Sequence, residues 1–169
     1  MTLPGWLIGL LLPACAAAGA HGLPRPPPVD MARLERPATP NTALAAPPGF
    51  VPAPDLVTPD LVSPVYPVPA ATLYAALRAV ASAQPRTWLA AEYPERGQMH
   101  WVVRSAFWNF PDLVTGQVLP DGPGAARLIL YSASVYGYGD FGVNRRRLQA
   151  WLAALSAALA PPREGPPHG

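Results

Sequence analysis

The chain has 169 residues, enough for one ordinary domain. Its net charge of +2 is small, it contains no lysine, and its arginines stand singly except at 145–147, which argues against nucleic-acid binding through a basic stripe. The 25 prolines gather in residues 1–69 and in the last nine residues, so residues 70–160 are predicted to form the folded domain and 161–169 a disordered tail.

The first 20 residues have the features of an export signal. No charged side chain occurs in residues 3–20, and prolines and glycines interrupt the apolar run, which favours a signal peptide over a membrane-spanning helix. Leu12-Pro13-Ala14-Cys15 resembles a bacterial lipobox and predicts a lipid on Cys15, whereas Ala18-Gly19-Ala20 fits ordinary cleavage. We therefore expect an exported protein of the cell envelope, lipid-anchored on the periplasmic or extracellular side of a membrane, with cleavage after Ala20 as the alternative.

Residues 21–69 are predicted to form a proline-rich tether. Pro26–Pro28 and the prolines that follow favour extended polyproline II, which acts as a semi-rigid spacer. Within this segment, Val62–Val68 alternates valine with proline and tyrosine, a pattern compatible with an edge strand against the domain.

A helix is predicted to begin after Pro69 and to end by Ala83, before Pro85. Four strands are predicted next, separated by turns at 94–97 and 120–124: residues 87–93, 98–105, 113–119 and 127–136. A last helix, stopped by Pro161, carries an apolar stripe: Leu148, Trp151, Leu152, Leu155 and Leu159. This order predicts an α+β fold, an antiparallel sheet of about four strands with both helices on one face and the other face open.

Arg145, Arg146 and Arg147 begin the last helix, where the macrodipole already makes the potential positive. An anion is therefore expected beside them. One interpretation is internal pairing with Asp140 or Asp112, and the other is an external phosphate or carboxylate. In either case Asn144 is expected to cap the helix.

Ser132 and Ser134 share one face of the strongest predicted strand. They are expected either to hydrogen-bond across the sheet or to line a small pocket, which Arg104 would join from another strand. A Ser134–His100–Asp112 assembly is the hydrolase alternative.

The remaining polar residues predict no cofactor. One domain histidine, His100, with scattered carboxylates and a distant thiol, does not form a metal-ligand set. The glycines at 137, 139 and 142 lack the spacing of a dinucleotide fingerprint. The aromatic residues between 88 and 110 are expected in the core, but Trp108 and Phe110, if exposed, would indicate a membrane or partner surface.

The segment Ser132-Ala133-Ser134, followed by residues 137–144 and Arg147, resembles the C-terminal signature of the domain of unknown function 1499 family. Pro40-Asn41-Thr42-Ala43 and Arg104-Ser105 with Asp112 resemble two weaker motifs of that family. The chain departs from the family pattern at three positions: Pro111, Val135 and Gly139. The resemblance implies a small exported or envelope-associated bacterial protein and assigns no activity.

From these observations we expect a non-enzymatic, envelope-anchored module that binds a small anionic group or a protein partner. The hydrolase that would use Ser132 or Ser134 with His100 is the alternative. The candidate binding residues come from three predicted strands and the start of the last helix: Arg104, Asp112, Ser132, Ser134, Asp140, Asn144, Arg145 and Arg147.

Overall fold

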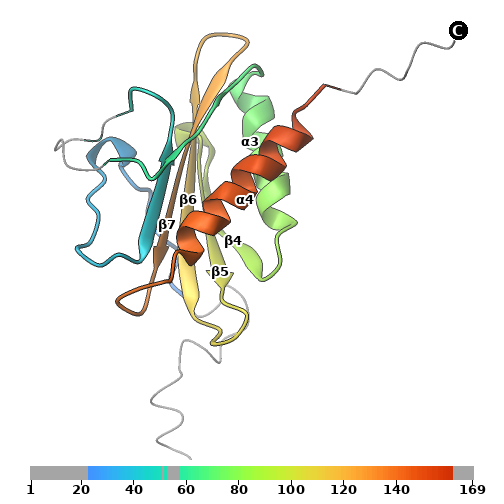
Figure 1. The fold of residues 1–169 in the computed structure, drawn as a ribbon. Helices are drawn as coiled ribbons and strands as arrows, with labels where there is room; N and C mark the ends of the chain where they lie inside the picture. The colour runs from blue at the N-terminus through green and yellow to red at the C-terminus, as the bar shows by residue number, and fades with distance from the viewer. Residues whose placement is uncertain (1–22, 51, 53–57, 162–169) are drawn as a thin grey trace, which may run out of the picture.

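The computed structural model describes residues 23–50, 52 and 58–161 (Figure 1). The predicted signal peptide with Cys15 lies outside the described residues, as does the predicted tail beyond Pro161. Among the described residues, no helix is both long and apolar enough to cross a membrane.

The described chain is an α+β fold with two α-helices and one sheet of seven strands. The helices are α3 (Ala70–Ser82) and α4 (Val143–Ala158), and two short 3-10 turns are η2 (Met31–Arg33) and η3 (Pro94–Arg96). The strands are β1 (Thr42–Ala46), β2 (Leu61–Val62), β3 (Val65–Tyr66), β4 (Thr87–Tyr93), β5 (Gln98–Arg104), β6 (Pro111–Pro120) and β7 (Ala126–Ser134). Both helices and all four strands predicted in residues 70–160 are present.

The sheet has the order β2-β1-β7-β6-β5-β4, and β3 also pairs with β7. Strands β4 to β7 form the predicted antiparallel meander. The prediction of about four antiparallel strands was wrong in number and type, because β1, β2 and β3 come from the segment predicted to be a tether, and β1 pairs with β2 in parallel. Prolines permit these strands because β1 lies between them and β2 and β3 are only two residues each.

Both helices pack on the same face of the sheet (Figure 1). α3 buries Leu73, Leu77 and Ala81, and α4 buries four residues in the same core: Leu148, Trp151, Leu152 and Leu155. The ring of Trp101, from β5, meets Trp151 edge to face with 5.4 Å between the ring centroids.

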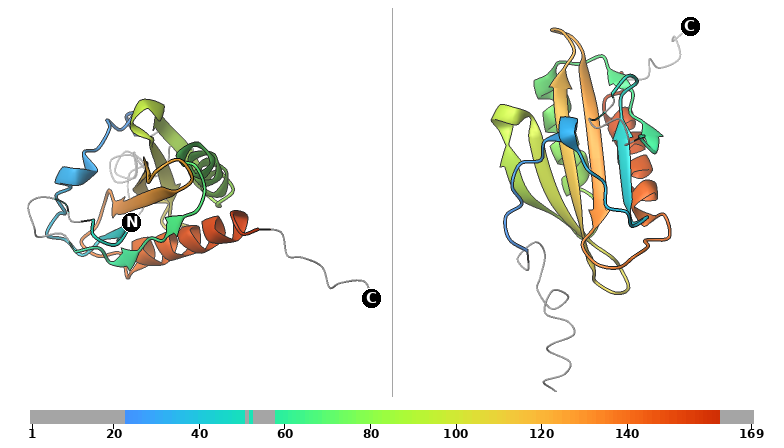
Figure 2. Two further views of the ribbon diagram at one scale, coloured as in Figure 1. Left: turned by 90° about the horizontal axis from the view of Figure 1, so that it is seen from above. Right: turned by 90° about the vertical axis from the view of Figure 1, so that its left-hand side faces the viewer.

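The other face of the sheet, expected to be open, is crossed by residues 23–34, which we call the strap (Figure 2). Met31 and Leu34 are buried there against Leu44, Ala46 and Ile129. The side-chain amide of Gln98 accepts from the backbone N–H of Val29 and donates to its carbonyl, both at 2.8 Å. The strap is therefore a packed part of the domain, and the predicted tether does not describe it.

Candidate functional site

Asp140 caps α4, a role that the sequence assigned to Asn144. One carboxylate oxygen accepts from the backbone N–H of Gly142 at 2.9 Å, and the other accepts from that of Asn144 at 2.8 Å. The acidic group thus lies where the helix macrodipole favours a negative charge. Because Asp140 already accepts from these two N–H groups, they are not free to bind an external anion.

Asn144 instead turns its fully buried side chain toward the sheet. Its Nδ2 donates to the Asn41 carbonyl at 2.9 Å and to Ser134 Oγ at 3.0 Å, and its Oδ1 accepts from Ser132 Oγ at 2.5 Å. The Asn41 side chain in turn donates to the Gly137 carbonyl at 2.6 Å. These bonds join β1, β7 and the start of α4, and they fix the loop between β7 and α4.

Arg147 is also drawn into this network. Its Nη1 donates to Ser132 Oγ at 2.9 Å and to Asn144 Oδ1 at 2.5 Å, and its Nη2 forms an ion pair with Asp112 Oδ2 at 2.5 Å. The side chains of Arg147 and Asp112 are each only 8% exposed. We call Asp112, Ser132, Ser134, Asn144 and Arg147 the clasp, because charge-assisted bonds within it connect β6, β7 and α4.

Arg104 is the candidate that the fold separates from the others. It follows Val103, a residue of the helix-side core, so it projects from the opposite face of β5. Its side chain is buried there, and Nη1 donates to the Asn109 carbonyl at 3.0 Å. Arg104 therefore supports the loop between β5 and β6 and does not join the clasp.

Arg145 and Arg146 remain at the surface of the first turn of α4. Arg146 Nη1 donates to the carbonyl of Phe141 at 2.8 Å. Within the described part of the chain, neither arginine lies within 4.0 Å of a carboxylate oxygen. They are the two exposed cations of the predicted arginine cluster.

His100 lies on the face opposite Ser132 and Ser134 and is 2% exposed. Its Nε2 is 3.1 Å from Gln98 Oε1 and its Nδ1 is 3.0 Å from Thr115 Oγ1. Because Gln98 Oε1 only accepts, Nε2 carries the proton and Nδ1 accepts from Thr115. Burial lowers the pKa of His100 from 6.5 to about 4. The residues of the hydrolase alternative are therefore not brought together.

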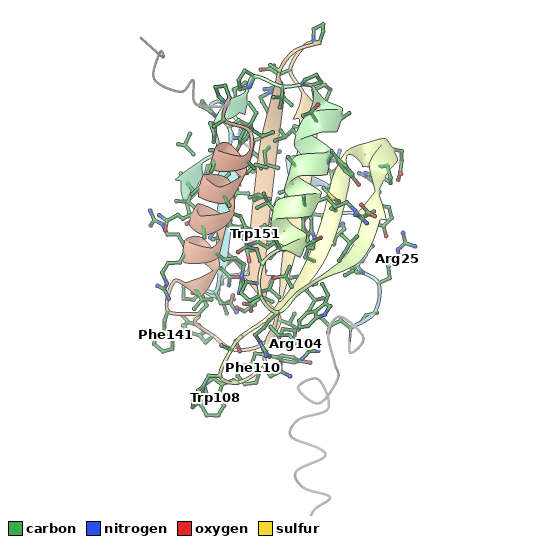
Figure 3. The ribbon with its side chains drawn as sticks, turned by 90° about the vertical axis from the view of Figure 1, so that its right-hand side faces the viewer. Arg25, Arg104, Trp108, Phe110, Phe141 and Trp151 are labelled. Carbon is green, nitrogen blue, oxygen red and sulfur yellow. The ribbon has the colours of Figure 1, made fainter. Side chains whose placement is uncertain are left out.

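An exposed aromatic surface at the same end of the domain was not among the predicted site residues (Figure 3). It comes from the β5–β6 loop and the β7–α4 loop, and we call it the aromatic tip: Phe107, Trp108, Phe110, Tyr136, Tyr138 and Phe141. Their exposed fractions run from 40% for Phe110 to 95% for Phe141. The sequence signal was available, since three of the four phenylalanines lie in two loops outside any apolar periodicity.

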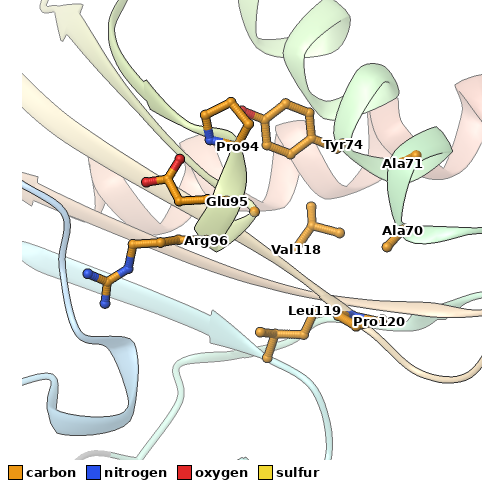
Figure 4. A pocket seen from close by; sticks show the side chains of 10 residues that line it. Ala70, Ala71, Tyr74, Pro94, Glu95, Arg96, Val118, Leu119 and Pro120 are labelled. Carbon is orange, nitrogen blue, oxygen red and sulfur yellow. The ribbon is translucent and has the colours of Figure 1, made fainter.

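A pocket of about 600 Å³ opens at the opposite end of the domain (Figure 4). It lies between the first turn of α3, η3 and the end of β6, and Tyr74, Pro94 and Val118 contribute to its largely apolar wall. It contains none of the predicted site residues. Among the described residues, no cluster of three or more His, Cys, Asp or Glu side chains is arranged to hold a metal ion.

Two solved structures resemble the chain distantly. The di-domain ARO/CYC BexL from the BE-7585A biosynthetic pathway is 17% identical, with a TM-score of 0.42 over 55% of this chain and 43% of that one. TTHA0849 from Thermus thermophilus is 15% identical, with a TM-score of 0.28 over 56% of this chain and 89% of that one. The chain thus spans less than half of the BexL chain.

No curated protein matches the sequence. A family match, in contrast, covers residues 34–155, well over half of the chain, and includes β1, the clasp and the aromatic tip. The family is described as "Protein of unknown function (DUF1499)", in agreement with the resemblance seen in the sequence. The chain belongs to the DUF1499 family.

Proposed function

We propose that this protein is a non-enzymatic binding module of the bacterial cell envelope, anchored by a lipid on Cys15. Its ligand is an anionic group, which it binds at the end of the domain where α4 begins. The clasp holds this end in shape, and the exposed Arg145 and Arg146 make the contacts.

The imbalance of charge at this end carries the proposal. Arg145, Arg146 and Arg147 stand in the first turn of α4, whereas the nearby acids, Asp112 and Asp140, are both used internally. Asp112 neutralises Arg147, and Asp140 is bound to the backbone N–H groups of the helix start, so the three arginines and two aspartates leave a net charge of +1 at this end, with Arg145 and Arg146 exposed. In water each such charge attracts an anion at contact by about 1 kcal/mol, and salt weakens the attraction.

The internal bonds of the clasp support binding over catalysis. Ser132 Oγ donates to Asn144 and accepts from Arg147, so its hydroxyl is committed to the network. His100, the one histidine among the described residues, lies on the other face, and nucleophilic catalysis needs a base within hydrogen-bond reach.

Titration of the full-length protein with inorganic pyrophosphate tests the proposal. In NMR spectra at low salt, we expect shifts confined to the first turn of α4, and we expect high salt to abolish them. Arg145→Gln combined with Arg146→Gln should remove the shifts. Arg96→Gln, at an exposed arginine of η3, is the matched control and should keep them. Equal responses of the two variants would show that the arginines of α4 are not the site.

A further inference from the structure

We propose that the anionic group is the surface of a lipid bilayer, and that the aromatic tip inserts into its interface while Arg145 and Arg146 meet the headgroup phosphates. The assignment of the arginines rests on the proposed function. The aromatic tip is an independent observation.

The aromatic tip is an apolar surface with no cover in the described structure. Phe107 is 85% exposed, Trp108 65% and Phe141 95%. Large apolar side chains gathered on a surface mark a site of interaction with a protein or a membrane. The composition favours the membrane, because tryptophan and tyrosine place an apolar ring and a polar atom at the level of the headgroups.

The two loops form one continuous surface through contacts between their rings. Phe107 meets Trp108 edge to face with 5.0 Å between centroids, Trp108 stacks on Phe110 at 6.4 Å, and Phe110 contacts Tyr136 at 6.4 Å. The first three residues belong to the β5–β6 loop and Tyr136 to the β7–α4 loop. Four of the six rings of the aromatic tip are therefore packed into one preformed surface.

The backbone holds these rings outward. Arg86, Asn109 and Phe141 are the described non-glycine residues with positive φ, and all three lie at this end. Phe141 has φ 52°, and Arg146 donates a hydrogen bond to its carbonyl. Positive φ is uncommon for a bulky residue and is kept only where surrounding contacts enforce it. Here the enforced conformation leaves a phenylalanine almost fully in water beside two exposed arginines.

The charge that flanks the aromatic tip matches a phosphate-rich surface. Arg86 is exposed and borders the β5–β6 loop, where its Nη2 donates to Asn109. Arg145 and Arg146 border the β7–α4 loop. Exposed cations on both sides of an apolar centre favour anionic lipid headgroups, and each arginine near such a surface strengthens binding about fivefold.

The length of the connection to the proposed anchor supplies the last argument. Only residues 16–22 separate Cys15 from Leu23, the first described residue. Fully extended, this connection reaches roughly 30 Å. Because the strap is packed on the sheet, the domain stays within that distance of the anchoring membrane. In Figure 2 the start of the described chain runs toward the end that carries the β5–β6 loop. The proposed anchor therefore keeps the aromatic tip within reach of the membrane.

The test uses the full-length, lipidated protein reconstituted in vesicles whose acyl chains are brominated, since bromine quenches tryptophan at the membrane interface. The fluorescence of Trp108 is obtained as the difference in emission between the natural protein and Trp108→Phe. We expect this signal to be quenched in vesicles that contain phosphatidylglycerol and to recover at high salt or in pure phosphatidylcholine. The near-ultraviolet circular dichroism of the Trp101–Trp151 pair reports in each sample that the core is intact.

Variants separate the two parts of the surface. Arg145→Gln with Arg146→Gln should lower the ratio of docked to undocked protein roughly 25-fold, at about fivefold for each arginine. Phe107→Ser with Phe141→Ser should also reduce quenching. Arg96→Gln and Val62→Ser, at an arginine and an apolar residue exposed elsewhere, should leave it unchanged.

Three outcomes would overturn the inference. Trp108 that stays unquenched in all vesicles would mean that the aromatic tip does not meet lipid. Equal quenching with and without phosphatidylglycerol would show that the protein does not recognise the anionic charge of the membrane. Unquenched Trp108 that becomes shielded from acrylamide only when an envelope extract is added would assign the tip to a protein partner. If pyrophosphate still binds at Arg145 and Arg146 in such cases, the proposed function survives without the lipid.

Discussion

Arg147 shows how a cation is accommodated in the first turn of a helix. The macrodipole and the free N–H groups oppose a positive charge at that position. Asp140 satisfies the N–H groups from one side, and Asp112 reaches Arg147 from β6. The internal pairing that the sequence analysis considered is therefore present between Arg147 and Asp112. Asp140 instead caps the helix.

The clasp predicts an asymmetric response to substitution. Asp112→Ala should lower the free energy of unfolding by about 3–5 kcal/mol, because it leaves the Arg147 charge buried without its partner. Asp112→Leu with Arg147→Met should recover much of that loss, since both charges are then removed. Urea denaturation measures both values. A loss below about 0.5 kcal/mol for Asp112→Ala would mean that the pair is effectively solvated.

His100 predicts a dependence of stability on pH. Its pKa is about 4 in the folded protein and 6.5 when exposed, so the unfolded chain binds a proton in this window that the folded chain does not. The contribution of neutral His100 to the free energy of unfolding is complete above pH 6.5. It is lost as the pH falls toward 4, and the total loss is roughly 3 kcal/mol.

Urea unfolding at several pH values, for the natural protein and for His100→Gln, tests this dependence. The difference in unfolding free energy between the two proteins should shrink by about 2 kcal/mol from about pH 7 to about pH 5. A constant difference would indicate that the imidazole becomes protonated without leaving its place between Thr115 and Gln98.

At the scale of the elements, the strap determines how the sheet's second face is covered. Met31 is 2% exposed and packs with Leu34 against β1 and β7. Met31→Ala should therefore lower the free energy of unfolding by about 2–5 kcal/mol, as expected for a core residue. Val62→Ala, at a residue 70% exposed on β2, should change it by no more than about 0.5 kcal/mol. If both substitutions change the free energy of unfolding by the same small amount, the strap is not firmly packed and the predicted tether describes it better.

The helices and the meander were predictable because their periodicity is strong, whereas β1 was not. Ala43 and Ala45 face the helices, while Leu44 and Ala46 face the strap. A strand buried on both faces shows no alternation of apolar and polar residues. β2 and β3 are too short to carry any pattern, and the surrounding prolines pointed to an extended spacer.

The candidate site was predictable in its residue types but not in its contacts. An acidic side chain was expected beside the start of α4, and Asp140 lies there. The sequence could not show that Asp140 would cap the helix while the side chain of Asn144 turned toward the sheet. Arg104 was grouped with the serines, yet the register of β5 against β6 places it on the other face. Trp108 and Phe110 were expected in the core, with a membrane or partner surface as the alternative if they were exposed. They are exposed, and the sequence could not decide this because loops have no periodicity that separates an exposed ring from a buried one.

At the scale of the whole molecule, the packed strap shortens the connection between the domain and the proposed lipid anchor. A spacer of residues 21–69 in polyproline II would have extended roughly 150 Å. With the strap in place, the proposed anchor on Cys15 is connected to the domain by residues 16–22 alone.

A flexible Gly/Ser insertion of about 20 residues between Gly22 and Leu23 tests the consequence of this short connection. The ratio of docked to undocked protein should fall about sevenfold, because effective concentration decreases roughly as the −3/2 power of linker length. Quenching of Trp108 by brominated lipid reports the ratio. The same insertion after Gly122, in the exposed β6–β7 turn, should have no effect. Unchanged docking after the first insertion would show that the connection does not determine it.

The position of β7 between β1 and β6 has a consequence for synthesis. β1 is the first long strand to leave the ribosome, yet its partner β7 is the last strand of the sheet, and α4 follows later still. The nascent chain cannot complete its hydrogen-bonded ladder until nearly all of it has been translated, and such distant pairings form slowly. If the proposed export takes place, this order of strands would delay completion of the sheet until most of the chain has been translocated.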